Sequence, residues 1–323
     1  MNERCPACDG GLRPWRAATA SDPELAGIRD YALTGCIACG TSRTELPPSA
    51  DAQSSLYEAG TYATMHPALD RLLEPYRALV ERDKLRFVRG LRRGARVLEV
   101  GAGDGRFVSR LQAAGFEARG IEPSDCGVRS ARARAAPVEQ VALEDVDLEP
   151  ASLDAVIAWH VLEHLNDPAR ALARIGPWLS PRGRLVVACP NLASLQARIG
   201  GDRWFHQDVP RHQTHFTALG LRLLLDRSGF RLKRMSHLLL EQNPFGMWQT
   251  LLNLLTRHRD VAFRALKGHL RAGPGVRRDL ALTAIAGPPL VPVAVGLELA
   301  AGLTGHGGSI VAIAEQRSGS QAQ

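Results

Sequence analysis

An apolar run, Val97-Leu98-Glu99-Val100, continues directly into the glycine-rich Gly101-Ala102-Gly103-Asp104-Gly105, and the amphipathic segment Arg106–Leu111 follows. This order predicts a strand that turns into a helix through glycines, which lets a ligand approach the backbone closely. The next expected strand ends at Glu122, 17 residues past Gly105, where a carboxylate can accept both hydroxyls of a ribose. A purely structural glycine turn is the alternative, and Glu122 argues against it.

Outward from this loop, short apolar runs alternate with helix-like segments. Such alternation is typical of a parallel sheet that is covered by helices on both faces, so the chain is expected to be an α/β protein. The expected strands are Arg96–Val100, Ala118–Ile121, Ala155–Trp159, Arg184–Ala188, Phe230–Leu238 and Ser309–Ala314. The expected helices are Phe107–Ala114, Ala169–Leu179 and Leu219–Ser228.

The composition is that of an ordinary soluble chain. It has 323 residues, 45% of them hydrophobic and 23% charged, which excludes a collagen-like chain, a wholly disordered chain and a polytopic membrane protein. Six cysteines do not make a disulfide scaffold, and the N-terminus lacks a basic region followed by an apolar one. We therefore expect a cytoplasmic protein, in which paired cysteines hold a metal rather than form disulfides.

The glycine spacing distinguishes two kinds of nucleotide ligand. A dinucleotide site has the pattern Gly-x-Gly-x-x-Gly, whereas this loop is Gly-x-Gly-x-Gly with Glu99 and Asp104 beside it. Carboxylates repel phosphate but suit a cationic ligand that carries an amino group. The loop therefore points to S-adenosylmethionine as the cofactor.

With these residues the chain resembles the class I S-adenosylmethionine-dependent methyltransferases. The resemblance covers about residues 90–240 and the last strand, and rests on residues 99–105, Glu122 and the later segments Leu153–Ile157, Val161–Pro168 and Pro181–Leu185. It implies a Rossmann-like seven-stranded sheet in which Gly101, Gly103 and Gly105 border the methionine part of the cofactor and Glu122 binds the ribose. The further cofactor contacts that it implies are Glu99, Ala142, Leu143 and Trp159.

The adenine contact departs from the family pattern. The segment Val141-Ala142-Leu143-Glu144 would pass the adenine, and Ala142 stands where the family often carries an acid. The resemblance then leaves this contact to the backbone or to Glu144.

The segment His160-Val161-Leu162-Glu163-His164 follows the fourth strand of the series. His-x-x-Glu-His is also a zinc-protease pattern, but the methyltransferase context argues against that interpretation. Three interpretations stay open: Glu163 and His164 fix the loop, His160 or His164 faces the substrate, or the cluster holds a divalent metal. The last follows from similar quinone-biosynthesis O-methyltransferases, which have an acid where this chain has His160.

A second histidine-rich segment, Trp204–Thr217, follows the fifth strand and holds three of the ten histidines. We call it the histidine lid, because ligands of α/β sheets lie outside the carboxyl ends of the strands. His212 or His215 is the expected general base, since histidine titrates near neutrality, and His206 is a weaker candidate. Helix capping and packing is the alternative.

Two Cys-x-x-Cys pairs, Cys5/Cys8 and Cys36/Cys39, predict a structural zinc site that holds a small ribbon at residues 1–48. Redox or incidental cysteines are the alternative, and Cys126 and Cys189 are expected to be ordinary buried residues. The ribbon has five arginines against six acids, a net charge of −1, which is a poor surface for RNA. The ribbon and the Leu56–Tyr62 segment after it resemble zinc-ribbon methyltransferases of small-molecule, sugar and cell-surface glycan pathways, so a structural or substrate-covering cap is expected.

An insertion of about 70 residues precedes the last strand. Residues 257–278 carry seven basic residues and one acid, and the nearly apolar run Leu282–Leu303 follows, with three prolines and Glu298. The prolines argue against a straight membrane-spanning helix, whereas a basic segment beside an apolar one fits a membrane interface. Substrate cover or a dimer contact is the alternative.

The expected organisation is a zinc ribbon (1–48), a bridging helical segment (49–93), a methyltransferase core (94–240), the helical insertion (241–306), the last strand (307–316) and a tail (317–323). The leading hypothesis is methyl transfer to a small-molecule, sugar, glycan or lipid-linked acceptor. The protein is expected in the cytoplasm or peripherally on the inner face of the membrane. The alternatives are an RNA methyltransferase that uses the ribbon for RNA contact and a non-catalytic scaffold that binds zinc and cofactor.

Overall fold

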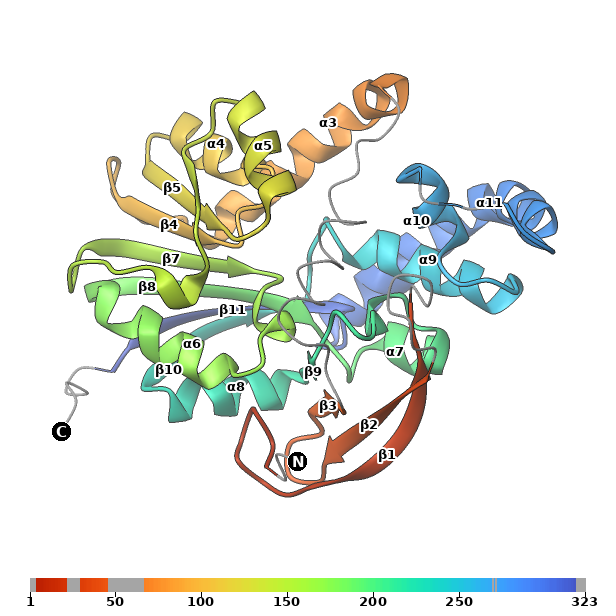
Figure 1. The fold of residues 1–323 in the computed structure, drawn as a ribbon, viewed down its shortest axis with the longest axis horizontal. Helices are drawn as coiled ribbons and strands as arrows, with labels where there is room; N and C mark the ends of the chain where they lie inside the picture. Colours follow the sequence, from red (N-terminus) through yellow and green to blue (C-terminus); the bar gives the residue numbers. More distant parts are fainter. Residues whose placement is uncertain (1–3, 22–29, 46–66, 269, 271, 318–323) are drawn as a thin grey trace.

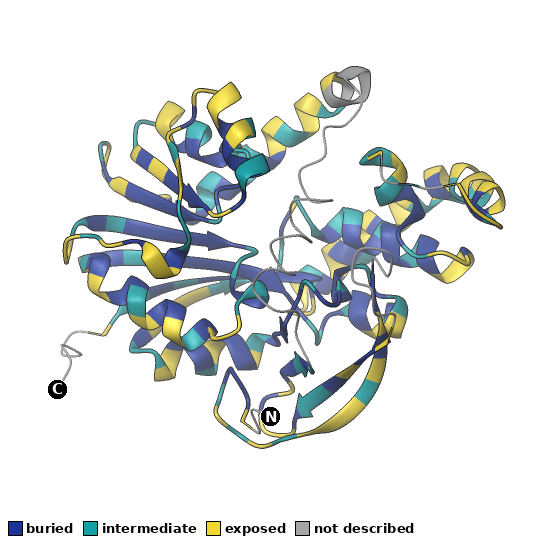
Figure 2. Cartoon of the chain, in the orientation of Figure 1, coloured by how far each residue is buried: buried dark blue, intermediate teal, exposed yellow. Residues whose placement is uncertain are grey.

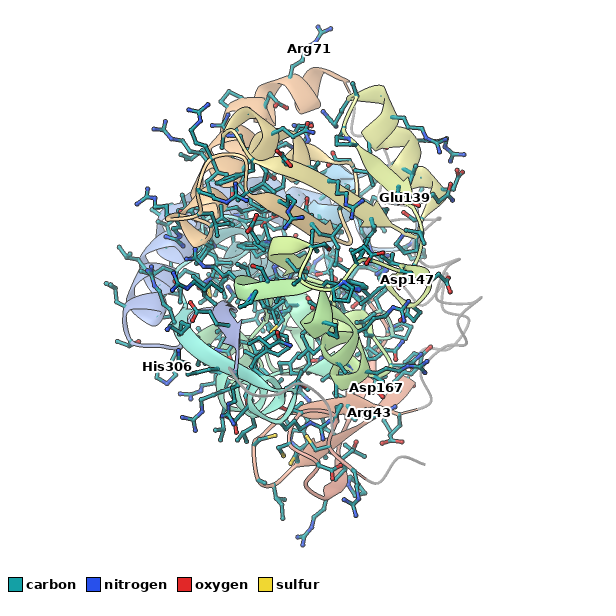
Figure 3. The ribbon with its side chains drawn as sticks, turned by 90° about the vertical axis from the view of Figure 1, so that its left-hand side faces the viewer. Arg43, Arg71, Glu139, Asp147, Asp167 and His306 are labelled. Carbon is teal, nitrogen blue, oxygen red and sulfur yellow. The ribbon has the colours of Figure 1, made fainter. Side chains whose placement is uncertain are left out.

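A computed structural model describes residues 4–21, 30–45, 67–268, 270 and 272–317. The Leu56–Tyr62 segment lies outside these residues. Within them, charged side chains such as those of Arg71 and Glu139 point away from the body of the molecule (Figure 3).

A seven-stranded mixed sheet forms the centre of the molecule (Figure 1). The strand order is β10-β11-β8-β7-β4-β5-β6, in which β11 is antiparallel to both of its neighbours. This confirms the predicted α/β fold with seven strands. The strands are β4 (Arg96–Val100), β5 (Glu117–Glu122), β6 (Val138–Gln140), β7 (Leu153–Trp159), β8 (Leu179–Pro190), β10 (Phe230–Ser236) and β11 (Ser309–Gln316).

Helices cover both faces of this sheet, because successive residues of a central strand point to opposite, equally apolar sides. Val97 and Leu98 of β4, for example, belong to different buried clusters. One face is covered by α3 (Pro67–Lys84), α4 (Arg106–Ala113) and α5 (Asp125–Ala133), the other by α6 (Pro168–Ile175) and α8 (Ala218–Arg227) (Figure 1). Helix α6 ends before the predicted Leu179, because Pro177 lies in the tighter turn η4 (Gly176–Trp178) and Leu179 already starts β8.

The N-terminal cysteines belong to a second, smaller sheet of order β1-β2-β3-β9. Its first three strands come from the ribbon, β1 (Leu12–Thr19), β2 (Asp30–Cys36) and β3 (Ser42–Thr44), and the fourth, β9 (Thr214–His215), comes from the histidine lid. Ser42 and Arg43 pair with His215 and Thr214. The ribbon is therefore attached to the lid by main-chain pairing.

Three helices form the insertion between β10 and β11, beyond the carboxyl end of the parallel strands (Figure 1). They are α9 (Asn243–Leu255), α10 (Val261–Leu266) and α11 (Val276–Leu303). Helix α11 is one continuous helix that contains the three prolines. It packs along α9, and Trp248 Nε1 of α9 donates to the Gly287 carbonyl at 2.8 Å, beside the prolines.

Among the described residues, α11 is long and apolar enough to cross a membrane by length and composition, with a mean hydropathy of 1.8 over 18 residues. Only 11% of that window is buried. Figure 2 shows that most of this helix is exposed.

Candidate functional site

The glycine loop joins β4 to α4 in the way that its residue types require. Gly101, Gly103 and Gly105 all have positive φ, at 67°, 54° and 71°. A Cβ on Gly101 would lie 2.7 Å from Val161 Cγ2, and one on Gly105 would lie 2.5 Å from Ala136 Cβ. The loop is thus held close to its neighbours in a conformation that side chains rarely adopt.

Glu122 lies at the carboxyl end of β5 and faces this loop. Gly103 N donates to its Oε2 at 3.0 Å, and Ser124 donates to its Oε1 through N and Oγ at 3.1 and 2.6 Å. The carboxylate is buried and has a fixed direction next to the loop. This is the placement that a ribose ligand needs at the end of the second strand.

A cluster of acids surrounds the buried Lys84 at the carboxyl end of β4 and β7. Lys84 Nζ lies 3.4 Å from Glu81 and 3.1 Å from Glu241, and 5.1 Å from the centre of the Trp159 ring. Trp159 Nε1 donates to Glu241 Oε2 at 2.6 Å. The aromatic rings and carboxylates form a site that is suited to a cation.

Glu99 belongs to the same cluster. Burial raises its pKa well above the usual range, although the positive charge of Lys84 opposes the shift. Its Oε2 is buried and has no hydrogen-bond partner among the described residues. An amino group near Glu99 would satisfy that oxygen.

Ala142 and Leu143 lie on the turn after β6, which the tight turn η2 (Leu143–Asp145) continues. Arg174 of α6 holds this turn, because its Nε donates to the Leu143 carbonyl at 2.9 Å and its Nη2 donates to Val146 O. Leu143 is buried, whereas Glu144 is exposed. Of the two contacts left open for adenine, the backbone is the one that this arrangement favours.

His160 directly follows β7 and has a φ of +56°, which is rare for a residue with a side chain. Its Nδ1 donates to Glu163 Oε1 at 2.9 Å, and its Nε2 is buried without a partner among the described residues. Burial by itself would raise the pKa of Glu163, but the hydrogen bond from His160 and the nearby His164 and His212 lower it to about 2. An ionised Glu163 therefore orients the His160 ring and leaves Nε2 able to accept a proton.

Glu163, His164 and His212 bring three ligand atoms within 4.8 Å of one another. His164 Nδ1 lies 3.1 Å from the Arg211 carbonyl, and His212 Nδ1 lies 2.9 Å from the His206 carbonyl. When each Nδ1–H donates to a carbonyl, Nε2 keeps its lone pair, as in histidines that bind metals. Burial and the neighbouring His212 lower the pKa of His164 to about 4, which keeps this ring neutral.

His215 takes part in the attachment of the ribbon. The Thr44 hydroxyl donates to the His212 carbonyl at 2.8 Å and accepts from His215 Nε2 at 3.0 Å. Burial and the neighbouring His212 lower the pKa of His215 to about 3. Of the two lid histidines proposed as a base, His215 holds the lid to the ribbon, whereas His212 reaches the Glu163 cluster.

The four cysteines of the two pairs converge. Their Sγ atoms lie within 4.8 Å of one another, and the Cys5–Cys39 and Cys8–Cys36 separations are 3.6 and 3.5 Å. A tetrahedron with zinc–sulfur bonds of about 2.3 Å has sulfur atoms about 3.8 Å apart. The donor set and its spacing therefore fit one zinc ion.

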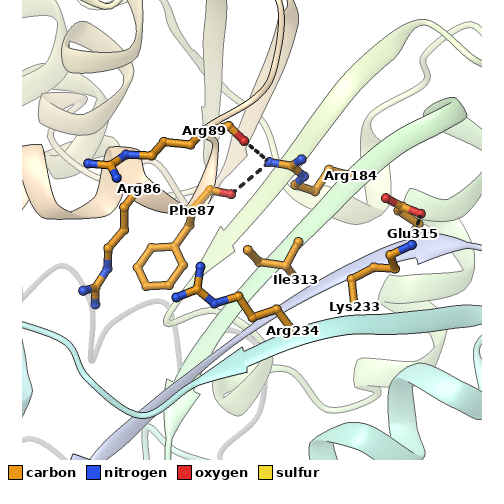
Figure 4. A pocket seen from close by; sticks show the side chains of 8 residues that line it. All are labelled: Arg86, Phe87, Arg89, Arg184, Lys233, Arg234, Ile313 and Glu315. Atoms are coloured by element: carbon orange, nitrogen blue, oxygen red, sulfur yellow. Dashed lines mark hydrogen bonds and ion pairs between the residues drawn. The ribbon is translucent and has the colours of Figure 1, made fainter.

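A cavity of about 360 Å³ lies elsewhere, between the turn after α3 and the strands β8, β10 and β11 (Figure 4). Its lining is basic, but Arg184 donates to the Phe87 and Arg89 carbonyls, and Lys233 pairs with Glu315 at 3.2 Å. It shares no residue with the glycine loop or the histidine clusters. We assign the site to the carboxyl end of the sheet and not to this cavity.

Sequence reasoning missed Lys84, Glu241 and Thr44. Lys84 carried one signal, because it is one of only three lysines among 40 basic residues. Glu241 and Thr44 reach the site from the insertion and from the ribbon, 82 and 171 residues away from their partners Trp159 and His215. No local pattern indicates such contacts.

Segments of this chain are similar to segments of known proteins. The ubiquinone biosynthesis O-methyltransferase of Alkalilimnicola ehrlichii is 30% identical over 105 residues, which cover 30% of this chain and 42% of that protein. An uncharacterized 37.1 kDa protein in transposon Tn4556 of Streptomyces fradiae is 37% identical over 112 residues, which cover 32% of each chain. The chain thus spans less than half the length of these curated relatives.

A solved structure of an S-adenosylmethionine-dependent methyltransferase from Archaeoglobus fulgidus has a TM-score of 0.47 and 18% identity, covering 76% of this chain and 98% of that one. The profile of the methyltransferase domain family matches residues 72–234, about half of the chain. These residues include the glycine loop, Glu122 and the His160–His164 segment, and by this match the chain belongs to the methyltransferase domain family.

Proposed function

We propose that this protein transfers the sulfonium methyl group of S-adenosylmethionine to a small-molecule, sugar, glycan or lipid-linked acceptor. The observation that carries the proposal is the glycine loop with three positive φ angles beside the fixed Glu122, within the matched family region. The loop would border the methionine part, Glu122 would bind the ribose, and Glu99, whose Oε2 has no hydrogen-bond partner among the described residues, would receive the amino group. Methyl transfer then depends mainly on holding the acceptor in line with the sulfonium.

Calorimetric titration with S-adenosylmethionine tests cofactor binding. We expect one site per chain, with affinity lowered at least about tenfold by Glu122→Ala and abolished by Gly103→Arg. Asp226→Ala, at an exposed acid of α8, is the control and should bind normally. A wild-type chain that binds no cofactor, or an equal loss in all three variants, would contradict the proposal.

His160 is the general base that we propose, with Glu163 as its positioning residue. Nε2 of His160 would take the proton of the acceptor hydroxyl or amine while the methyl group transfers. His160→Asn keeps a residue that tolerates positive φ, so the fold should survive. We expect kcat to fall about 10²-fold or more in product-formation assays with unchanged cofactor affinity, whereas unchanged kcat would remove His160 from this role.

A divalent metal held by Glu163, His164 and His212 is the second candidate, favoured by the carbonyl partners of both imidazoles. Such an ion would act as a Lewis acid on the acceptor oxygen. Calorimetric titration with Mg²⁺ and Zn²⁺ separates the two candidates. Saturable metal binding that His212→Ala removes would support the metal site. If no ion binds and the enzyme is active, His160 is supported as a base that acts without a metal.

For the four cysteines we propose a structural zinc ion. One zinc per purified chain is expected by elemental analysis, and Cys36→Ser should release it and loosen the ribbon. A zinc-free chain with four freely reactive thiols would contradict this. With zinc bound, the ribbon would act as a cap: its strand pairing with the lid would keep His212 at the Glu163 cluster.

We propose a cytoplasmic protein. RNA is disfavoured as acceptor because the ribbon carries a net charge of −1. Strong, salt-dependent RNA binding would favour RNA instead. Turnover of S-adenosylmethionine with any acceptor would exclude the non-catalytic scaffold.

A further inference from the structure

Helix α11 exposes the kind of side chain that a helix of a soluble protein buries. Its buried residues are small or acidic rather than large and apolar: Val276, Asp279, Gly287, Ala294, Glu298 and Ala301. Every exposed residue from Leu280 to Leu303 is apolar or glycine, including Ile285 at 74% and Leu303 at 70% exposure. Leu254 and Leu255 at the end of α9 are also exposed. Most of the large side chains of α11 are therefore exposed, and none of its leucines or isoleucines is fully buried.

The charges of the insertion are sorted in the same way. Of its four acids, Asp260, Asp279 and Glu298 are buried. The fourth, Glu241, is half-buried and pairs with Lys84 at 3.1 Å. The exposed charged residues that the structure describes between 243 and 303 are cationic: Arg257, Arg277 and Arg278. Arg277 and Arg278 lie in the first turn of α11, where the helix dipole disfavours cations, so helix stability does not explain them.

We propose that the outer face of α11, with Arg257, Arg277 and Arg278 beside it, binds the surface of an anionic lipid bilayer. An apolar face with exposed cations at its edge matches acyl chains below anionic headgroups. A symmetric contact between two copies would bring the same cations together. The inference goes beyond methyl transfer and does not depend on the acceptor.

Helix α11 lies in the interface and does not cross the bilayer, because its inner side is committed to protein along its length. Trp248 binds the Gly287 carbonyl, and Gly308 N donates to Glu298 Oε2 at 3.1 Å, more than two turns further along. A Cβ on Gly302 would lie 2.4 Å from Leu238, so the end of the helix also packs closely. Lipid can therefore reach the outer face only. Since the insertion lies beyond the carboxyl end of the sheet, membrane contact places the proposed site near the bilayer (Figure 1).

Flotation of the full-length protein with vesicles tests this. The vesicles are phosphatidylcholine alone or with about a quarter phosphatidylglycerol, at about 0.1 M and about 1 M NaCl. The wild type should float with the anionic vesicles at low salt. Ile285→Asp should lower the partition coefficient about tenfold or more, and replacing Arg277 and Arg278 with Gln should lower it about fivefold for each residue.

Leu219→Asp is the matched control, because Leu219 is 41% exposed on α8, outside the proposed surface. It should float like the wild type, and all variants should keep the wild-type thermal transition and cofactor affinity. The proposal is overturned if the wild type ignores anionic vesicles or if Ile285→Asp floats unchanged. A dimer that Ile285→Asp dissociates would assign the face to a second copy, and resistance to alkaline carbonate extraction from membranes would show that α11 spans the bilayer.

Discussion

Helices α8 and α11 bury opposite kinds of side chain. In α8 the buried residues are Gly220, Leu221, Leu224 and Leu225, while Arg222, Asp226 and Arg227 face solvent. In α11 most of the leucines and valines are exposed or half-buried, and the buried residues are one valine, a glycine, two alanines and two acids. The first arrangement gains free energy by leaving water for the sheet. The second arrangement removes its large apolar side chains from water only when α11 contacts another apolar medium.

The two helices also differ in what holds their ends. Thr217 caps α8 by accepting from Gly220 N at 2.9 Å, and its hydroxyl donates to the Cys39 carbonyl of the ribbon at 2.6 Å. Helix α11 begins at Gly275, which offers no side-chain cap. The number of apolar residues in a helix therefore does not show which of its faces is buried. The elements that pack against the helix decide this.

The largest expected difference in unfolding free energy is between two variants that each introduce one aspartate, the first in α8 and the second in α11. Leu224→Asp buries a carboxylate in the core and should lower the free energy of unfolding by more than about 4 kcal/mol. Ile285→Asp should change it by less than about 0.5 kcal/mol, because the side chain is exposed. Urea denaturation followed by circular dichroism measures both, and comparable losses would show that the outer face of α11 is covered.

The acid on the inner face of α11 should make stability depend on pH. Burial raises the pKa of Glu298 to about 7, although the hydrogen bond from Gly308 N opposes the shift. Because the unfolded chain ionises first, this contribution is complete below about pH 4.5 and is lost as the pH rises to 7, by about 3 kcal/mol. The difference in unfolding free energy between wild type and Glu298→Gln should follow this window. A difference that is flat with pH would mean that Glu298 is solvated.

Alanine substitution of one glycine in each helix should give smaller changes in unfolding free energy, of opposite sign in α8 and α11. A Cβ on Gly220 of α8 would lie 1.9 Å from Thr41 Oγ1, whereas a Cβ on Gly296 of α11 meets nothing within 4 Å. Gly220→Ala should therefore lower the unfolding free energy by about 1–3 kcal/mol, and the added Thr41→Ser change should not relieve the clash, whereas Thr41→Ala should.

Gly296→Ala should instead raise the unfolding free energy by about 0.5–1 kcal/mol, because alanine is the better helix former. The same urea titrations measure both glycine variants. If Gly296→Ala is destabilising, a neighbour must occupy the outer side of α11 in solution, which would remove the contrast between the helices.

The central sheet was predictable because its signals are local. Short continuous apolar runs for strands buried on both faces, and glycines where φ is positive, appear within a few residues of each other, so β4, the glycine loop and Glu122 lie where the sequence predicts. The prolines of α11 did not indicate that one helix runs through them, because a local rule does not include the packing of α9 along the helix.

The sequence by itself therefore determined the α/β sheet, the glycine loop and the two Cys-x-x-Cys pairs. Each of these depends on residues that are close together in the sequence. Only the tertiary structure decided that β9 pairs with β3, that Glu241 reaches Trp159 and that α11 turns its apolar side outward. These features join segments tens to hundreds of residues apart. Their free energy comes from burial between segments, which neither segment encodes without the other.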